Sequence, residues 1–283
     1  MRITIALTAL LCATALAQDA DPWKRKVYFG EQHLHTVNSP DAFSMGTRNT
    51  PDDAYRFAKG EAVKKSTSGQ VIQKRTPYDW AAVTDHSEYL GMMPLLLDPS
   101  SPLQQTEIGK LISSGNPEDG EAAFQIIISS ASTGQPVDYL VDPKIMKSAW
   151  QGQVDAANKH YEPGKFTTLV AYEWSSQPNS QNLHHNVFFR DAEGPEVPFS
   201  SFDSTHREDL WAWQEKQREL GHENFSINHN ANVSYSMMFA LNKSDGTPID
   251  KEWAEMATRN TVASEMVQTK GTSETHPALS PND

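Results

Sequence analysis

The sequence predicts an α/β fold in which strands alternate with helices, the order of elements found in a β/α barrel. Short apolar runs recur along the 283 residues, and patterns typical of helices separate most of them. Several of these runs end in histidine, aspartate or glutamate. In a β/α barrel the carboxyl ends of the strands share one face, where functional sites are built. The chain has no internal repeat and no clear linker, so we expect one domain over residues 18–283.

Strands are expected at six apolar runs: residues 27–29, 80–83, 166–171, 186–189, 225–227 and 263–267. A hairpin is expected over 62–74, because Ser68-Gly69 is a turn signal between polar, β-leaning flanks.

Helices are predicted by their end signals. Thr50, Pro51 and Asp53 form an N-terminal capping pattern, and Gly60 marks the end of that helix. Further helices are expected to begin near residue 117, to run from 144 to about 161 after Asp142-Pro143, and to run over 207–220 before Gly221.

The start of the chain is typical of a secretory signal peptide. An arginine precedes an apolar run over residues 3–16, and Ala15-Leu16-Ala17 fits the cleavage pattern, so we expect cleavage after Ala17 and a periplasmic or secreted protein. A buried N-terminal helix is the alternative. The only cysteine, Cys12, lies in this segment, and the bulky Leu11 disfavours lipid attachment there. The mature chain therefore has no disulfide and no thiolate ligand.

The formal charge of −12 argues against a general nucleic-acid or anionic membrane surface. No later apolar run is long enough to span a membrane. The charge still allows a small anionic substrate to bind at a metal ion. The oligomeric state is left open.

His33 and His35 are the first candidate metal ligands. They follow the run at 27–29 with a spacing of two, and residues i and i+2 of an extended segment point the same way. Asp41 comes six residues later, after a Ser-Pro turn signal, and a carboxylate there could return to the same place.

Further candidates lie at the ends of later apolar runs. Taken singly, each has an ordinary explanation, such as a helix cap, an ion pair, a surface pair or a core histidine. Together at strand ends they indicate a metal site, and imidazoles with carboxylates but no thiolates suit zinc, manganese or iron. Two or three ions could share a bridging carboxylate. His160, His206 and His222 are assigned to surface helices. The strand-end candidates are Asp85, His86, Glu173, His184, His185 and His229.

Two segments resemble the first motifs of the polymerase-and-histidinol-phosphatase (PHP) superfamily, namely His33-Leu34-His35-Thr36 with Asp41, and Ala82-Val83-Thr84-Asp85-His86. That superfamily comprises metal-dependent phosphoesterases on a distorted β/α barrel. A longer pattern resembles one secreted bacterial branch, the domain-of-unknown-function family 3604. The segments that carry it are 29–36, 84–91, 172–175, 182–184, 229–230 and 270–277.

The resemblance implies seven metal ligands, with Glu173 as the bridge and His184 preferred over His185 because of the triplet Asn182-Leu183-His184. The seven are His33, His35, Asp41, His86, Glu173, His184 and His229. Families of this type close the barrel with a late Asp-x-His pair, which this sequence lacks. We therefore expect an N-terminal fragment of a longer protein, or else a site short of two ligands.

The first functional hypothesis is hydrolysis of phosphate esters by metal-activated water, with Lys270 or Arg190 holding the anion. Hydrolysis of amides, carboxylic esters or sulfate esters is an alternative with the same ligands. A metal- or partner-binding module without turnover is the third. The sequence contains no serine-hydrolase elbow, phosphate-binding Gly-Lys-Thr/Ser loop, dinucleotide fingerprint or His-Glu-x-x-His motif.

Overall fold

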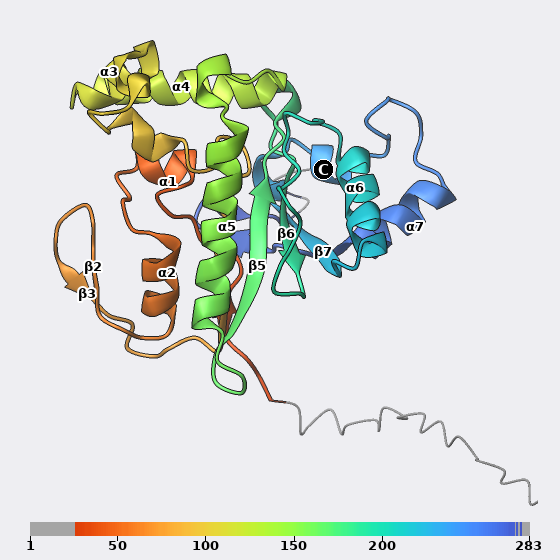
Figure 1. Cartoon of the computed structure of the whole chain (residues 1–283). Coiled ribbons are helices and arrows are strands. Elements are labelled where there is room, and N and C mark those ends of the chain that lie inside the picture. The colour runs from red at the N-terminus through yellow and green to blue at the C-terminus, as the bar shows by residue number, and fades with distance from the viewer. Residues whose placement is uncertain (1–25, 275, 277, 279–283) are drawn as a thin grey trace, which may run out of the picture.

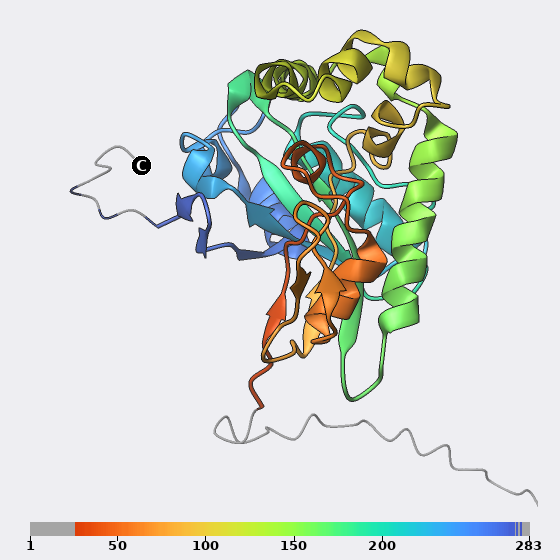
Figure 2. The same cartoon turned by 90° about the vertical axis from the view of Figure 1, so that its left-hand side faces the viewer.

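A computed structural model describes residues 26–274, 276 and 278 of the chain. Its centre is a curled sheet with the strand order β1-β4-β5-β6-β7-β8 (Figures 1 and 2). All neighbours pair in parallel except β6, which is antiparallel to both β5 and β7. The strands are β1 (Gly30–Glu31), β4 (Trp80–Ala82), β5 (Thr167–Trp174), β6 (His184–Phe189), β7 (Asn224–His229) and β8 (Thr261–Ser264).

Helices cover one face of the sheet and one of its ends. The long helix α5 (Pro143–His160) packs along β5 and against α2 (Pro51–Ala58), while α6 (Arg207–Glu219) and α7 (Lys251–Asn260) pack against β7 (Figure 1). The remaining helices, α1 (Pro40–Ser44), α3 (Glu107–Ser113) and α4 (Pro117–Thr133), lie together beyond the carboxyl end of β5. Two small hairpins complete the fold: β2 (Val63–Lys64) with β3 (Val71–Ile72), and β9 (Val267–Gln268) with β10 (Gly271–Thr272).

Two of the predicted helix starts are confirmed by their capping hydrogen bonds. The Thr50 hydroxyl accepts from the amide of Asp53, whose carboxylate accepts from the amide of Thr50, so α2 begins with a reciprocal capping box. Asp142 accepts from two amides in the first turn of α5. Helix α7 was not predicted, although its N-cap Asp250 accepts from the amide of Trp253.

Three apolar clusters hold these layers together, the smallest formed by Ala82, Ala171 and Phe188 on the sheet. The largest lies between the sheet and its covering helices and contains Trp150, Tyr172 and Trp174, all fully buried. The Trp150 indole donates a hydrogen bond to the carbonyl of Pro195 at 2.8 Å, which satisfies its polar atom. The second core joins α1, α3 and α4 and includes Phe43 and Met93. This second core anchors the helices beyond the strand ends.

The α/β class is confirmed, but the expected β/α barrel is not. Within the described residues the sheet is an open, curled half-barrel that includes an antiparallel strand. The run at 27–29 is not a strand either. Its three side chains are about two-thirds exposed or more, because the chain enters here at the edge of the sheet, where β1 has a neighbour on one side alone.

His160 also differs from its prediction as a surface residue. It is buried at the end of α5, and its Nε2 lies 2.9 Å from an Asp52 oxygen on α2. The pair links the two helices. No helix in the described range has both the length and the apolar character needed to cross a membrane. The predicted signal peptide, residues 1–17, lies outside the described residues.

Candidate metal centre

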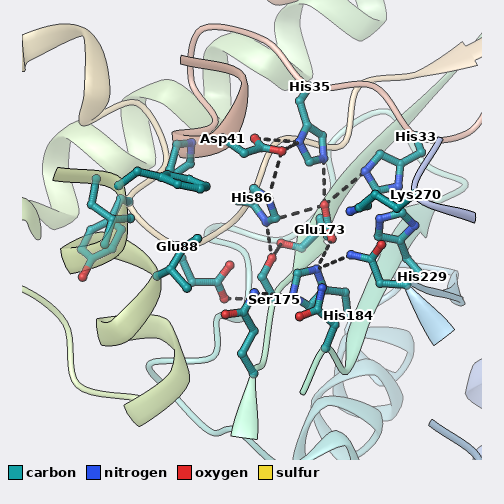
Figure 3. A pocket seen from close by; sticks show the side chains of 18 residues that line it. His33, His35, Asp41, His86, Glu88, Glu173, Ser175, His184, His229 and Lys270 are labelled. Carbon is teal, nitrogen blue, oxygen red and sulfur yellow. Dashed lines mark hydrogen bonds and ion pairs between the residues drawn. The ribbon is translucent and has the colours of Figure 1, made fainter. Parts of the chain in front are cut away.

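Six side chains from different parts of the chain meet at the carboxyl end of β5 (Figure 3). Two come from the segment after β1, one from the residue bridged to β5 after β4, one from β5 itself, and one each from β6 and β7. Parallel strands bring their carboxyl ends to one edge of a sheet, so these positions become neighbours. The residues are His33, His35, His86, Glu173, His184 and His229.

His184 reaches the site because β6 runs against its neighbours. Its position is the first of the strand, and the amino end of an antiparallel strand lies beside the carboxyl ends of the strands that flank it. The register pairs His184 with His229 on β7 and Asn186 with Glu173 on β5.

Glu173 lies at the middle of the cluster and is fully buried. Its Oε2 atom is 2.7 Å from Nε2 of His35, 3.3 Å from Nε2 of His33 and 3.6 Å from Nδ1 of His86. Its Oε1 atom is 2.6 Å from Nδ1 of His184. The two oxygens of one carboxylate therefore face different imidazoles, which is the arrangement of a bridging ligand.

Two further carboxylates position the imidazoles. Nδ1 of His35 lies 2.9 Å from both oxygens of Asp41, and Nδ1 of His229 lies 2.7 Å from Oε2 of Glu265. An acid on one ring nitrogen fixes the tautomer and turns the other nitrogen toward the site. Asp41 also lies 3.6 Å from Nε2 of His86, so it is placed to act either as a ligand or as an orienting group.

Burial and charge shift the pKa values of these groups. Burial alone raises the pKa of the Glu173 carboxyl, but the imidazoles around it, His86 and His33 first, hold that pKa well below its usual range. Burial lowers the pKa of His229 to about 4, against the opposing effect of Glu265. Glu173 is therefore an anion and His229 a neutral imidazole at pH 7, and these are the forms that bind metal ions.

Two buried atoms test whether a cation fits. His35 Nε2 and Glu173 Oε2 are 2.7 Å apart, yet neither makes a hydrogen bond within the described part of the chain. If Nδ1 of His35 donates to Asp41, lone pairs on both atoms face each other, and a proton or a metal ion between them removes the repulsion. Burial lowers the pKa of His35, but Asp41 and Glu173 together raise it well above its usual value.

The donor atoms also group as divalent ions require. Four sets of three ligand atoms each lie within 4.8 Å of one another, and all four consist of imidazoles and carboxylates. Neighbouring sets share members, so ions bound to them would be adjacent. The sets are His33, His35 and Glu173; His86, Glu173 and His184; His35, Asp41 and His86; and His33, His229 and Glu265.

Asp85 was predicted as a metal ligand, but its side chain is hydrogen-bonded to Thr36 and belongs to none of the ligand sets found among the described residues. Its two oxygens accept hydrogen bonds from the amide of Thr36 at 2.5 Å and from the Thr36 hydroxyl at 2.6 Å. Burial raises the pKa of Asp85 to about 6. Asp85 thus fastens the segment that carries His33 and His35 to the end of β4.

Arg190 was predicted to hold an anion but does not lie at the site. It follows the last residue of β6, and six residues of strand span roughly 20 Å, so Arg190 lies toward the opposite end of the sheet, where it is exposed. His185 points to the other face of β6, beside the Trp174 ring, because neighbouring strand residues alternate. Lys270, the other residue expected to hold the anion, does line the cavity (Figure 3).

Glu265 lies at a strand end instead of inside the strand expected over 263–267, because β8 ends at Ser264. Two further contributors were missed by sequence reasoning. Asn186 lies two residues after His184, on the same face of β6, and its amide is 2.9 Å from Nδ1 of His33. Ser175 contacts Nδ1 of His86. Segment 172–175 includes this serine, but the pattern there does not show its partner, because Ser175 reaches His86 through the pairing of two distant segments.

The cluster forms one wall of a cavity of about 220 Å³. Helix α4 forms the opposite wall with Phe124, Ile127 and Ile128, and Glu88 lies between the two. The volume suits a small molecule rather than a polymer segment.

Fold and side chains together define an α/β protein with a buried cluster of imidazoles and carboxylates that could hold metal ions. Comparison with protein families adds one match, to the family described as "Protein of unknown function (DUF3604)", over residues 22–283. The chain belongs to this family. No curated protein and no solved structure matches it.

The resemblance to the PHP superfamily was wrong. The matching family is not a PHP family, and the open half-barrel with its antiparallel strand is not clearly a PHP barrel. The two motifs that carried this resemblance, a His-x-His pair and an Asp-His pair, are short. Such pairs describe how a strand end presents ligands, and they leave the rest of the fold open.

Proposed function

We propose that this protein is a metal-dependent hydrolase that uses two or three divalent ions, zinc, manganese or iron. The observation that carries the proposal is the buried Glu173 carboxylate, whose two oxygens face separate imidazoles. The ions would be held by Glu173, His33, His35, His86, His184 and His229, with Asp41 and Glu265 orienting two of the imidazoles or joining them as ligands.

Divalent ions bound at such a centre lower the pKa of water and stabilise negative charge that develops on oxygen. The chain supplies the rest of the chemistry. Asp41 and Glu265 fix ring orientation, and the buried carboxylates balance the positive charge. The exposed Lys270 ammonium lies at the cavity and would attract an anionic group.

A phosphate ester is the substrate class that we favour, because Lys270 adds positive charge to a cavity of small volume. Amides, carboxylic esters and sulfate esters would use the same ligands. The chain charge of −12 disfavours nucleic acid as a partner. The proposed compartment, periplasmic or secreted, rests on the sequence pattern of residues 1–17.

A substrate screen tests the proposal. Purified protein, stripped by a chelator and reloaded with manganese or zinc, is assayed on chromogenic phosphate, carboxylic ester, amide and sulfate substrates. We expect turnover that requires metal, and a content above one ion per chain. His33→Ala and His86→Ala should abolish turnover. His206→Ala is the control, because His206 is exposed at the start of α6.

Three outcomes would contradict the proposal. A content of one ion per chain or fewer would exclude the multi-metal centre. Full metal loading without turnover on any substrate class would instead favour a metal-binding module without catalysis. Equal loss of activity in all three folded variants would mean that the site is misplaced.

A further inference from the structure

The cavity is also lined by a carboxylate that is not part of the metal centre. Glu88 lines the cavity, is 3% exposed, and belongs to none of the ligand sets found among the described residues. Its Oε1 atom accepts hydrogen bonds from the amide of Ser201 at 2.6 Å, the amide of Ser175 at 3.3 Å and the hydroxyl of Ser87 at 3.2 Å. Three donors hold this oxygen, and thus the whole carboxylate, in a fixed orientation.

The other oxygen, Oε2, is different. It is buried, and no described residue donates a hydrogen bond to it. Glu88 also forms no ion pair with any lysine, arginine or histidine in the described residues, whereas the carboxylates of Glu173, Asp41 and Glu265 each face an imidazole. A buried carboxylate oxygen without a donor is costly, which makes a donor supplied by a ligand favourable.

Ser175 shows how near this group is to the metal centre. Its hydroxyl contacts Nδ1 of His86, while its amide donates to Oε1 of Glu88. One residue therefore separates the Glu88 carboxylate from a proposed ligand (Figure 3). A single small molecule can reach both.

The wall beside Glu88 is apolar. Phe124, Ile127 and Ile128 of α4 line the cavity at successive turns of the helix. Carbon atoms of a ligand would pack against these side chains, because apolar surface gains free energy when it leaves water.

We propose that Glu88 Oε2 accepts a hydrogen bond from a hydroxyl or ammonium group of the substrate, whose carbon chain lies against α4 while its scissile group lies at the metal centre. The inference rests on the proposed function and narrows its substrate class to small molecules that carry a hydrogen-bond donor near the scissile group.

Hydroxamic acids test this without requiring turnover, since the hydroxamate group binds divalent metals whatever bond the enzyme cleaves. Metal-loaded protein is titrated by calorimetry with three matched probes: propionohydroxamate, glycolohydroxamate and glycine hydroxamate. They end in a methyl, a hydroxyl and an ammonium group. The same three end groups are also tested with one more methylene in each chain, because the spacing to Glu88 is part of the question.

We expect the hydroxyl or ammonium probe to bind about 10- to 100-fold more tightly than the methyl probe, as a hydrogen bond to a buried charged group would give. Glu88→Gln keeps the shape and an oxygen for the three donors, but it turns an N–H group toward the cavity. The preference should disappear in this variant while the methyl probe binds as before. Glu193→Gln is the matched control, because Glu193 is exposed in a loop.

Comparing the hydroxyl and ammonium probes then distinguishes a neutral donor from a cationic one. Equal binding of all three end groups at both lengths would overturn the inference, since a donor on the ligand would then gain no free energy from Oε2. A preference that persists in Glu88→Gln would also overturn it, as would tight metal binding with no binding of any hydroxamate. Failure of the wild-type protein to bind metal would instead refute the proposed function itself, and metal analysis separates that case.

If Glu88→Gln does not fold, the wild-type preferences and Glu88→Asp, which retracts the carboxylate by one methylene, decide the question.

Discussion

Replacing Glu173 by glutamine should remove most of the stability that metal ions give to this protein. The side chain keeps its size, but one oxygen becomes an NH₂ group that donates hydrogen bonds and cannot bind a cation. Since Oε2 faces His33 and His35 and Oε1 faces His184, one substitution affects every ion that the carboxylate would bridge.

The size of the effect follows from linkage. An ion present at about 100 times its Kd stabilises the folded state by about 2.7 kcal/mol. For a domain of about 250 residues, each kcal/mol raises Tm by roughly 2–4 °C, so the wild-type protein should gain about 5–11 °C. Groups that merely orient a ligand change metal affinity by about 10- to 100-fold, so losing a shared ligand should weaken binding by at least about 100-fold. The same ion concentration then equals the new Kd, and the gain falls to about 0.4 kcal/mol, or roughly 1–2 °C.

The assay is thermal unfolding of each protein after chelation and again after addition of zinc or manganese. The shift is taken within each variant, so any change in the stability of the metal-free form cancels. Glu193→Gln serves as the control and should keep the full shift. An unchanged shift in Glu173→Gln would refute the bridging role, and the absence of a shift in the wild-type protein would refute the metal centre.

Three further predictions concern the surroundings of the centre. Asp85→Ala should destabilise the protein by about 1–3 kcal/mol in denaturant titration, because the Thr36 amide and hydroxyl lose a buried acceptor, and should weaken metal binding; normal stability and normal metal binding together would contradict the fastening role. Lys270→Met should raise KM for an anionic substrate without changing the metal content, whereas Arg190→Met should change neither KM nor metal content. If the two substitutions raised KM equally, long-range charge and not the cavity would attract the anion. Trp150→Ala should cost about 3–5 kcal/mol of unfolding free energy, because the side chain is fully buried in the largest core, and a loss below about 1 kcal/mol would contradict that packing.

Local signals were enough for much of the secondary structure. Thr50 with Asp53, and Asp142, marked helix starts through contacts with residues two or three positions away. The strands around residues 80 and 225 were also located from their apolar composition. Such contacts and patterns lie within a few residues of sequence, so a local interpretation can find them. The apolar run at 27–29 was wrongly predicted as a strand, because composition does not reveal whether a segment has a neighbouring strand on each side.

For the site, the sequence by itself determined which residue types were available and, at His33 and His35, that two imidazoles would point the same way. The tertiary structure alone decided which of the others join them. Strand direction brought His184 in and carried Arg190 away, while alternation along β6 turned His185 to the other face. These outcomes depend on direction and register, which are set by hydrogen bonds between segments far apart in the chain. A pattern read along one segment contains no information about the partner to which that segment will be hydrogen-bonded.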